Sequence, residues 1–288
     1  MLENIKSPIS CYKEKFSINT RKKIIIYITI AVVYLLVVFI WGITMNPEKY
    51  GVNYSNKFIS PCSNHLFGTD FMGRDMFYRC IKGLSNSILI GIVASLISSV
   101  IALIFGVSSA LIGGIYDRVI NWCIDACMGM PHLILLILIS FMLGKGGKGV
   151  AIAVAVTHWT SLTRVLRAEI KQIQTSDYVK LSERLGKSKI WIATKHILPL
   201  IVSQIIVGVI LMFPHAIMHE AAITFLGFGL PPHEPAIGVI LSESMHYLSS
   251  GYWWLAFYPG LSLLIVVLLF DLIGENVEKL LNPETAQE

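Results

Sequence analysis

The sequence is short of charge. Asp, Glu, Lys and Arg make up 14% of its 288 residues, whereas about 25% is usual in soluble domains. Hydrophobic residues make up 55% of the chain, and its mean hydropathy is +0.67. No basic run is interleaved with aromatic residues, so the net charge of +5 does not indicate binding to nucleic acid. These shortages exclude an ordinary soluble domain and favour a protein that crosses a membrane several times.

Motifs for metal centres and nucleotides are also missing. The five cysteines show no zinc-site spacing. Gly186-Lys187-Ser188 looks like the end of a phosphate-binding loop, but such a loop has a glycine five residues before its Gly-Lys pair, and residue 181 is Leu. We therefore expect no cofactor and no ATP hydrolysis by this chain. Cys62 and Cys80 fall in one polar segment, where free thiols are favoured over a disulfide.

Long apolar runs are what the sequence does have. The first is residues 24–44, and about 20 apolar residues suffice for a helix to cross a bilayer. A signal peptide is the alternative, but its apolar region would be shorter, and Met45-Asn46-Pro47-Glu48 offers no cleavage site of small residues. Five more spans are predicted at 84–112, 119–143 (with Pro131 inside), 150–163 (continuing as helix into polar residues), 200–222 and 254–273. The predicted fold is all-α, a polytopic membrane protein with six transmembrane helices.

The distribution of Lys and Arg predicts the orientation of these spans. Sixteen of the 23 fall on the side shared by the two chain ends, and seven fall on the other side. The positive-inside rule then places both termini in the cytoplasm and the chain in the cell (inner or cytoplasmic) membrane. The expected organisation is a cytoplasmic tail (1–23), the first span (24–44), an extracytoplasmic loop (45–83), a five-helix core (84–274) with a cytoplasmic loop at 164–199, and a cytoplasmic tail (275–288).

Residues 177–199 form the longest polar interruption of the membrane-embedded part. They contain a charged, helix-compatible run, then Gly186, then a second run that ends in Leu198-Pro199. A helix–turn–helix with glycine at the turn can present a short helix to a groove on a partner. An ordinary charged cytoplasmic loop is the alternative.

The spacing from Gly186 to Leu198-Pro199 resembles the EAA loop of ABC importer permeases, although Lys180-Leu181-Ser182 replaces the Glu-Ala-Ala that gives the loop its name. The resemblance implies that this segment couples the pore to ATPase subunits. The residues that would carry the coupling are Asp177, Tyr178, Lys180, Glu183, Arg184 and Gly186, with Pro199 setting the turn into the membrane.

A second segment narrows the resemblance to one family. Residues 65–75, HLFGTDFMGRD, resemble the HxxGTDxxGRD signature of permeases in the oligopeptide/dipeptide/nickel importer family, and residues 224–232, 254–261 and 271–283 also resemble that family. In this loop Gly68 and Gly73 would allow tight turns. Asp70, Arg74 and Asp75 would pair to hold the loop at the membrane surface, where exposed pairs are worth little. A structural role is expected for all five residues, and none is expected to be catalytic.

The resemblance implies a subunit that forms half of a translocation pore in a binding-protein-dependent importer. Its partners would be a second, non-identical permease, two ATPase subunits, an extracytoplasmic solute-binding protein and the lipid bilayer. ATP hydrolysis would then belong to the partners, and this chain would not be an enzyme. An autonomous channel or secondary transporter is one alternative, although it calls for polar groups deep in several spans and often an internal repeat. A metal-dependent intramembrane enzyme is the other.

Histidines in the predicted spans are the candidate substrate contacts. His215 and His219 are four residues apart and so share one helix face. Glu220 follows, but Ala216 stands where an HExxH motif has Glu, so a zinc peptidase is poorly supported. Ionisable groups inside a membrane helix indicate function by default, and neutral histidine binds nickel well.

We therefore predict His215 and His219 as transient metal ligands and, together with His158, as part of the substrate path. The alternative is that these histidines cap a helix end or bond to a neighbouring helix. His132, which follows Pro131, is expected to be a packing residue. The cargo stays open among small peptides, free nickel and chelated nickel.

Overall fold

The computed structural model describes residues 8–281, with their side chains from residue 21 onward. Every regular element in this range is a helix, and the one β-type pairing there is an isolated bridge between Thr69 and Asp75. The all-α prediction is therefore confirmed. Residues 1–7 and 282–288, which belong to the two predicted tails, lie outside the described residues.

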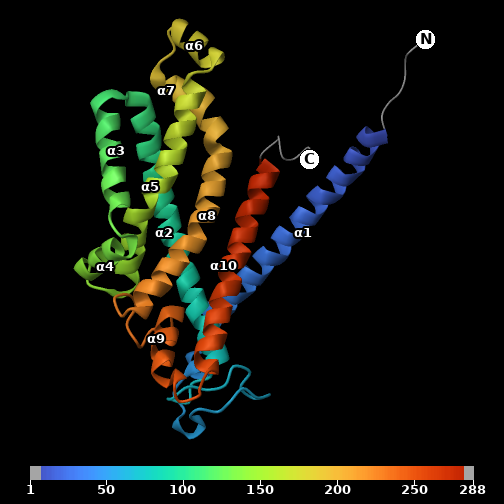
Figure 1. The fold of residues 1–288 in the computed structure, drawn as a ribbon, viewed down its shortest axis with the longest axis vertical. Helices are drawn as coiled ribbons and strands as arrows, with labels where there is room; N and C mark the ends of the chain where they lie inside the picture. Colours follow the sequence, from blue (N-terminus) through green and yellow to red (C-terminus); the bar gives the residue numbers. More distant parts are fainter. Residues whose placement is uncertain (1–7, 282–288) are drawn as a thin grey trace.

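Within residues 8–281, five helical segments are long and apolar enough to cross a membrane (Figure 1). They are α1 (Pro8–Thr44), α2 (Met76–Ile112), α5 (Gly146–Gln174), α8 (Leu198–Phe225) with the helical residues just before it, and α10 (Trp254–Leu281). A sixth span is present if the bent pair α3 (Gly114–Gly129) and α4 (His132–Met142) counts as one. The chain is a multi-pass membrane protein, as predicted.

The third predicted span is broken where a continuous helix with an internal proline was expected. α3 and α4 meet at an angle of 99° across Met130 and Pro131. Proline disfavours a helical conformation for the residue before it, and Met130 has φ −91° and ψ 145°, which is extended backbone. α3 therefore runs along the bundle, whereas α4 turns across it (Figure 1).

Two other boundaries differ from the sequence-based expectation. α2 begins at Met76, inside the segment predicted as loop, because Asp75 caps it by accepting hydrogen bonds from the amides of Phe77 and Tyr78. Its 37 residues span about 55 Å, which exceeds the roughly 30 Å of a bilayer's hydrocarbon core. The segment 223–253, expected to be a loop, contains the helix α9 (Ile237–Leu248).

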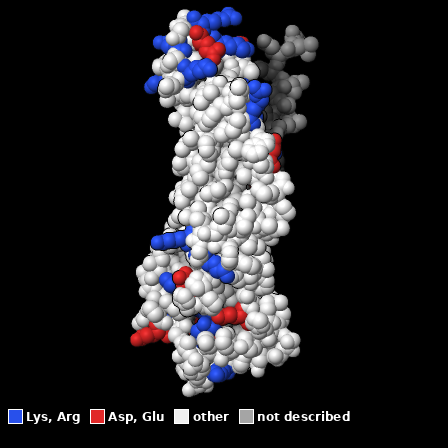
Figure 2. Space-filling view, turned by 90° about the vertical axis from the view of Figure 1, so that its left-hand side faces the viewer, with Lys and Arg blue, Asp and Glu red and all other residues white. Residues whose placement is uncertain are grey.

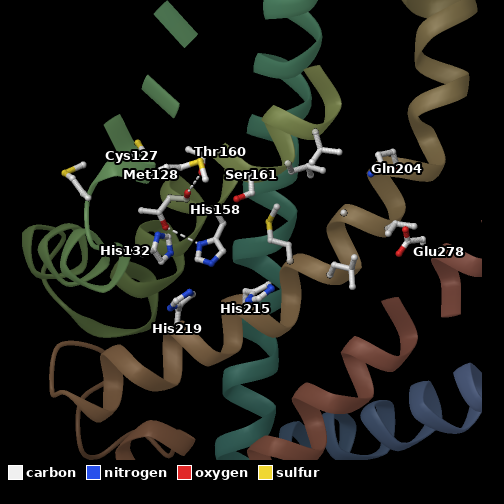
Figure 3. A pocket seen from close by; sticks show the side chains of 18 residues that line it. Cys127, Met128, His132, His158, Thr160, Ser161, Gln204, His215, His219 and Glu278 are labelled. Atoms are coloured by element: carbon white, nitrogen blue, oxygen red, sulfur yellow. Dashed lines mark hydrogen bonds between the residues drawn. The ribbon is translucent and has the colours of Figure 1, made fainter. Parts of the chain in front are cut away.

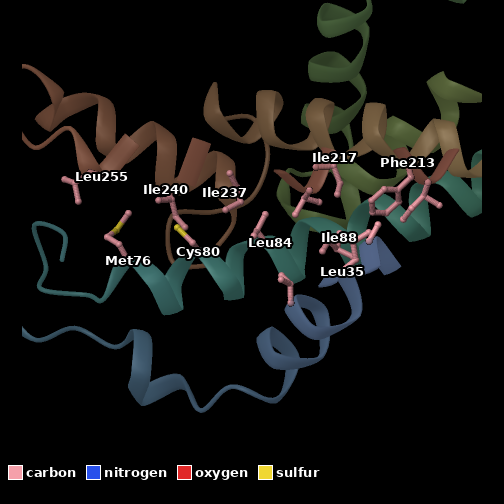
Figure 4. Close-up of a cluster of buried hydrophobic side chains, with 14 of the residues drawn as sticks. Leu35, Met76, Cys80, Leu84, Ile88, Phe213, Ile217, Ile237, Ile240 and Leu255 are labelled. Atoms are coloured by element: carbon pink, nitrogen blue, oxygen red, sulfur yellow. The ribbon is translucent and has the colours of Figure 1, made fainter. Parts of the chain in front are cut away.

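The helices pack around α2, which contacts α1, α5, α8 and α10. In one cluster, shown in Figure 4, side chains of α2 such as Leu84 and Ile88 meet Leu35 of α1 and Phe213 and Ile217 of α8. At Gly91 the absence of a side chain permits the close approach of α8, since a Cβ there would lie 2.8 Å from Cγ1 of Ile217. Small residues commonly allow such approach between membrane helices.

Charged side chains gather toward the two ends of the bundle. Figure 2 shows Lys and Arg concentrated at the end that carries α6 (Asp177–Arg184), a mixed group at the opposite end, and few charges between them. The start of α1 and the end of α10 point toward the α6 end, whereas α9 and the loop before α2 lie at the other (Figure 1). This arrangement has the separation of ends that a membrane span requires.

Candidate functional site

The polar stretch after α5 folds into two short helices with a turn between them. α6 ends at Arg184, Gly186 adopts φ +74°, and α7 (Lys189–Ile192) follows. The amide of Gly186 donates to the Glu183 carbonyl at 2.9 Å, and that of Lys187 donates to the Ser182 carbonyl at 3.1 Å. These bonds close the end of α6 in a conformation that favours glycine. The predicted helix–turn–helix is confirmed.

α6 is attached to the bundle by little of its surface. Val179 is its one buried residue and packs with Ile170 of α5 and with Ile192 and Ile197 on the chain after the turn. Ser182 and His196 add a link, with 3.0 Å between Oγ and Nε2. The other residues predicted for coupling on this helix are exposed: Asp177, Tyr178, Lys180, Glu183 and Arg184. Their exposure leaves them available to a partner.

Pro199 does not sit at a turn. The chain from Lys189 to Phe225 is one continuous helical run, and it contains a π-type turn, η3, at Ala193–Ile197. A proline inside a helix has no amide to donate to the fourth preceding carbonyl. The wider turn lies directly before it, where the amide of Leu198 donates to the carbonyl of Ala193. The predicted turn into the membrane at Pro199 is therefore replaced by a local widening of the helix.

The end of α5 nearest α6 is fixed to two other helices through Asp117 of α3. Its carboxylate accepts hydrogen bonds from Nε and Nη2 of Arg167 at 2.5 and 2.8 Å and from Nζ of Lys171 at 2.8 Å. It also accepts one from Ser109 of α2. This cluster was not found from the sequence, because Asp117 lies 50 residues from Arg167. The cluster links α2, α3 and α5 to one another near the α6 end of the bundle.

At the opposite end, the loop before α2 contains a buried network of ion pairs. Asp70, 2% exposed, accepts from Nε of Arg74 at 2.6 Å and from Nη1 of Arg79 at 3.0 Å. Both arginines also donate to Oε2 of Glu243 on α9, at 2.9 and 2.6 Å. Gly68 (φ +71°) and Gly73 (φ +74°) make the turns expected of them.

This network differs from the exposed pairs that the sequence suggested. Asp70 and Arg74 do pair, but Asp70 is buried and the Arg74 side chain is 12% exposed, and their further partners Arg79 and Glu243 were not predicted. Asp75 binds His65 instead, with 2.7 Å between Oδ2 and Nδ1, while capping α2. Cys62 and Cys80 are both free thiols, one exposed and one buried.

A cavity of about 530 Å³ lies between these ends (Figure 3). Its wall is formed mainly by α3, α4, α5 and α8, with polar groups that include Ser161, Gln204 and His215. Figure 3 shows His132, His158 and His219 grouped at one side of the cavity and His215 further along α8. All three histidines predicted for the substrate path therefore line one cavity.

The structure groups the histidines differently from the predicted pair. One ring nitrogen each from His132, His158 and His219 lies within 4.8 Å of the others, and His215 is not in this group. His132, expected to be a packing residue, comes next to His158 and His219, with ring centroids 4.8 and 4.6 Å away. The break at Pro131 is responsible, because it makes His132 the first residue of a helix that turns toward the cavity.

An apolar helix bundle with a polar cavity, an ion-pair network at one end and an exposed charged helix at the other is the architecture expected of a membrane transport subunit. Residues 83–285 match the model of the family described as "Binding-protein-dependent transport system inner membrane component", and the chain belongs to that family. It is thus a permease subunit of an ABC importer.

Named relatives cover almost the whole chain. The putative peptide transport system permease protein BruAb2_1032 of Brucella abortus is 30% identical over 283 residues, 98% of this chain and 94% of that protein. The dipeptide transport system permease protein DppC of Bacillus subtilis is 31% identical over 226 residues, 78% of this chain and 71% of its own. The oligopeptide transport system permease protein OppC of B. subtilis is 29% identical over 280 residues, 97% and 92% of the two chains.

Proposed function

We propose that this chain forms half of the translocation pore of a peptide importer. The observation that carries the proposal is the histidine-lined cavity, whose walls α5 and α8 are the two helices joined by the α6 segment. The peptide cargo is supported by the relatives, each of which is named as a peptide, dipeptide or oligopeptide permease. A cavity of this volume falls in the range of small-molecule sites.

Energy would come from two separate ATPase subunits that bind α6. A short exposed helix that docks in a groove is a recurring mode of recognition, and α6 exposes Tyr178 (45%) and Leu181 (58%) among its charges. Since α6 follows α5 after two residues and leads through α7 into α8, a displacement of α6 moves two walls of the cavity. The Asp117 cluster would carry that displacement into α2 and α3.

The remaining partners would occupy the other faces. The α6 end and both termini would face the cytoplasm, and the α9 end, held by the Asp70 network, would face an extracytoplasmic solute-binding protein. A second permease would complete the pore on the open side of the cavity, where His215 is exposed.

The test is reconstitution of the whole importer in lipid nanodiscs. Peptide-loaded binding protein should raise ATP hydrolysis by the nanodisc complex severalfold over the empty binding protein. In proteoliposomes that carry the same importer, labelled di- or tripeptide should enter only when ATP is supplied on the side of the membrane that holds the ATPases. Peptide uptake by this chain by itself, without ATPases, would contradict the proposal in favour of an autonomous transporter.

A further inference from the structure

The three grouped histidines come from three different helices. His132 is the first residue of α4, His158 lies in the middle of α5, and His219 lies in the C-terminal half of α8. Their ring centroids are separated by 4.6 to 5.1 Å, and the rings point toward a common centre in Figure 3. A donor set assembled from separate helices is built by the fold and is not a by-product of helical spacing.

Hydrogen bonding of His158 leaves a nitrogen free to bind a ligand. Its Nδ1 lies 3.0 Å from the carbonyl oxygen of Val154, which can only accept a hydrogen bond. Nδ1 therefore carries the proton in the neutral ring, and Nε2 keeps an unshared electron pair. A backbone carbonyl that fixes the tautomer in this way is a usual feature of histidine ligands to metals.

His132 provides a second, independent observation. Its Nε2 is buried and has no hydrogen-bond partner among the described residues. A buried polar atom without a partner is unfavourable, and a ligand in the cavity would supply the partner. His132 belongs to the same group of three, in which one ring nitrogen of each histidine lies within 4.8 Å of those of the other two.

The chemistry of the surrounding wall selects among possible ligands. Cys127, Met128 and Met130 line the same cavity, so sulfur donors accompany the imidazole nitrogens, and the uncharged oxygens there belong to hydroxyl and amide groups. The one acidic residue in the lining is Glu278, which Figure 3 shows on the far side from the histidines. Nitrogen and sulfur donors favour transition metals, whereas Mg²⁺ and Ca²⁺ require oxygen.

We propose that His132, His158 and His219, hereafter the histidine triad, bind one divalent transition-metal ion in this cavity, either as the free ion or as a complex with a small chelator. The proposal rests on the proposed function in one respect, since it takes the cavity to be part of the transport path, and it makes a transition metal part of the cargo. Three protein ligands leave coordination positions open, and these positions would be filled by water or by the chelator.

The geometry requires a modest closure. Metal–nitrogen bonds of about 2.1 Å place neighbouring ligand nitrogens roughly 3 to 3.5 Å apart, compared with separations of up to 4.8 Å here. Side-chain rotation or a small change in the bend before His132 brings them together. A site that is completed only on binding holds its ion weakly enough to release it, as transport demands.

Metal binding to the purified full-length chain in nanodiscs tests the proposal. The chain should carry a tag without histidine, and the probes are Ni²⁺ and Co²⁺, each offered as the free ion and as its complex with free histidine. We expect the unsubstituted chain to bind one ion. Each of the variants His132→Gln, His158→Gln and His219→Gln should bind it with at least tenfold lower affinity. X-ray absorption at the nickel edge should show imidazole nitrogens of the protein at about 2.1 Å.

Matched controls separate this site from adventitious binding. His246→Gln, on exposed α9 surface, should bind the metal as the unsubstituted chain does. Triad-dependent binding of the free ion identifies it as the ligand, and triad-dependent binding of the complex alone identifies a chelate. Binding that survives all three triad substitutions, or no binding in either form, overturns the proposal.

A further readout distinguishes this inference from the proposed function. Peptide-stimulated ATP hydrolysis by the complete importer shows whether each variant folds and couples. If the importer carries peptide while the chain binds no metal, the metal site is wrong and the peptide function stands. If metal is bound through the triad while peptide neither stimulates ATP hydrolysis nor enters, the peptide function is wrong and the site stands.

Discussion

The two ends of the bundle are held in opposite ways. At the α9 end, Asp70, Arg74, Arg79 and Glu243 form a network in which Asp70 and Arg79 are almost fully buried. At the other end, α6 is anchored by the single buried side chain of Val179 and otherwise exposes its charges. We call the network of Asp70, Arg74, Arg79 and Glu243 the clamp, because it fixes its end of the bundle, and α6 the lever, because little of it is fixed.

The difference indicates where movement is expected. Buried ion pairs have few alternative arrangements, because separating them leaves a charge without a partner in a poorly solvated place. Elements with few buried contacts open more readily. If ATPase subunits displace α6, as proposed above, the Asp70 network provides a fixed point at the α9 end, and the cavity lies between the two.

The largest effect on stability is expected from breaking the clamp. Asp70→Asn leaves two arginines to share Glu243 and removes the charge-assisted bonds to their guanidinium groups. Removing one partner of a buried ion pair costs about 3–5 kcal/mol. Equilibrium unfolding of the purified chain, followed by tryptophan fluorescence, measures this loss.

An exposed ion pair provides the control for the clamp. Asp125 and Arg164 are 2.7 Å apart, but their side chains are 70% and 50% exposed. Asp125→Asn should therefore change the free energy of unfolding by less than about 1 kcal/mol. Equal losses in the two variants would show that burial does not distinguish the clamp.

The next largest effect is expected at the turn after α6. Gly186→Pro requires φ near −65° where the backbone has +74°, and it removes the amide that donates to Glu183. The local cost is about 3 kcal/mol or more, and α6 should lose its position. ATP hydrolysis by the importer should then become insensitive to loaded binding protein, while the free energy of unfolding of the helix bundle stays close to its original value.

Gly129→Ala is the matched control, because it sits in α3 with ordinary helical φ and no atom within 4 Å of an added Cβ. It should keep normal coupling. Unchanged transport by an importer that carries Gly186→Pro would show that α6 is not the coupling element.

The same contrast explains what the sequence could predict. The apolar runs identified the membrane helices, since burial in lipid requires about 20 such residues whatever their neighbours are. The turn at Gly186 was also predictable, because its signal is local. The clamp was not, since Arg79 and Glu243 are 164 positions apart and neither carries a local sign of its partner.

The predicted grouping of the histidines was wrong for a related reason. Helical spacing joined His215 to His219, but the fold joined His219 to residues of two other helices. The proline rule for preceding residues predicts an extended Met130, and applying it would have broken the third span. It would not have shown which side chains His132 meets, because that depends on how α4 packs against α5 and α8.

A smaller effect is expected where α6 meets the bundle. Val179→Ala removes two methyl groups from a fully buried side chain, at about 0.8 kcal/mol each. α6 should detach more often, so its backbone amides should exchange with solvent deuterium faster than those of α5. Leu181→Ala, on the same helix but 58% exposed, is the control and should leave exchange unchanged. Equal exchange in the two variants would mean that α6 has another anchor.

The smallest effect on the chain itself is expected from its exposed charges. Lys180→Glu reverses one charge on α6 without touching the buried Val179, so the free energy of unfolding should change by less than about 0.5 kcal/mol. A charge at the rim of an interface acts mainly on the rate of association and its dependence on salt. The affinity of the purified permease pair for its ATPase subunits should therefore change severalfold at low ionic strength and converge on the original value at high ionic strength. Lys49→Glu, at the opposite end of the bundle, should show no such dependence. If the two substitutions act alike, the exposed face of α6 is not where the ATPases bind, and the lever must lie elsewhere on the α6 end.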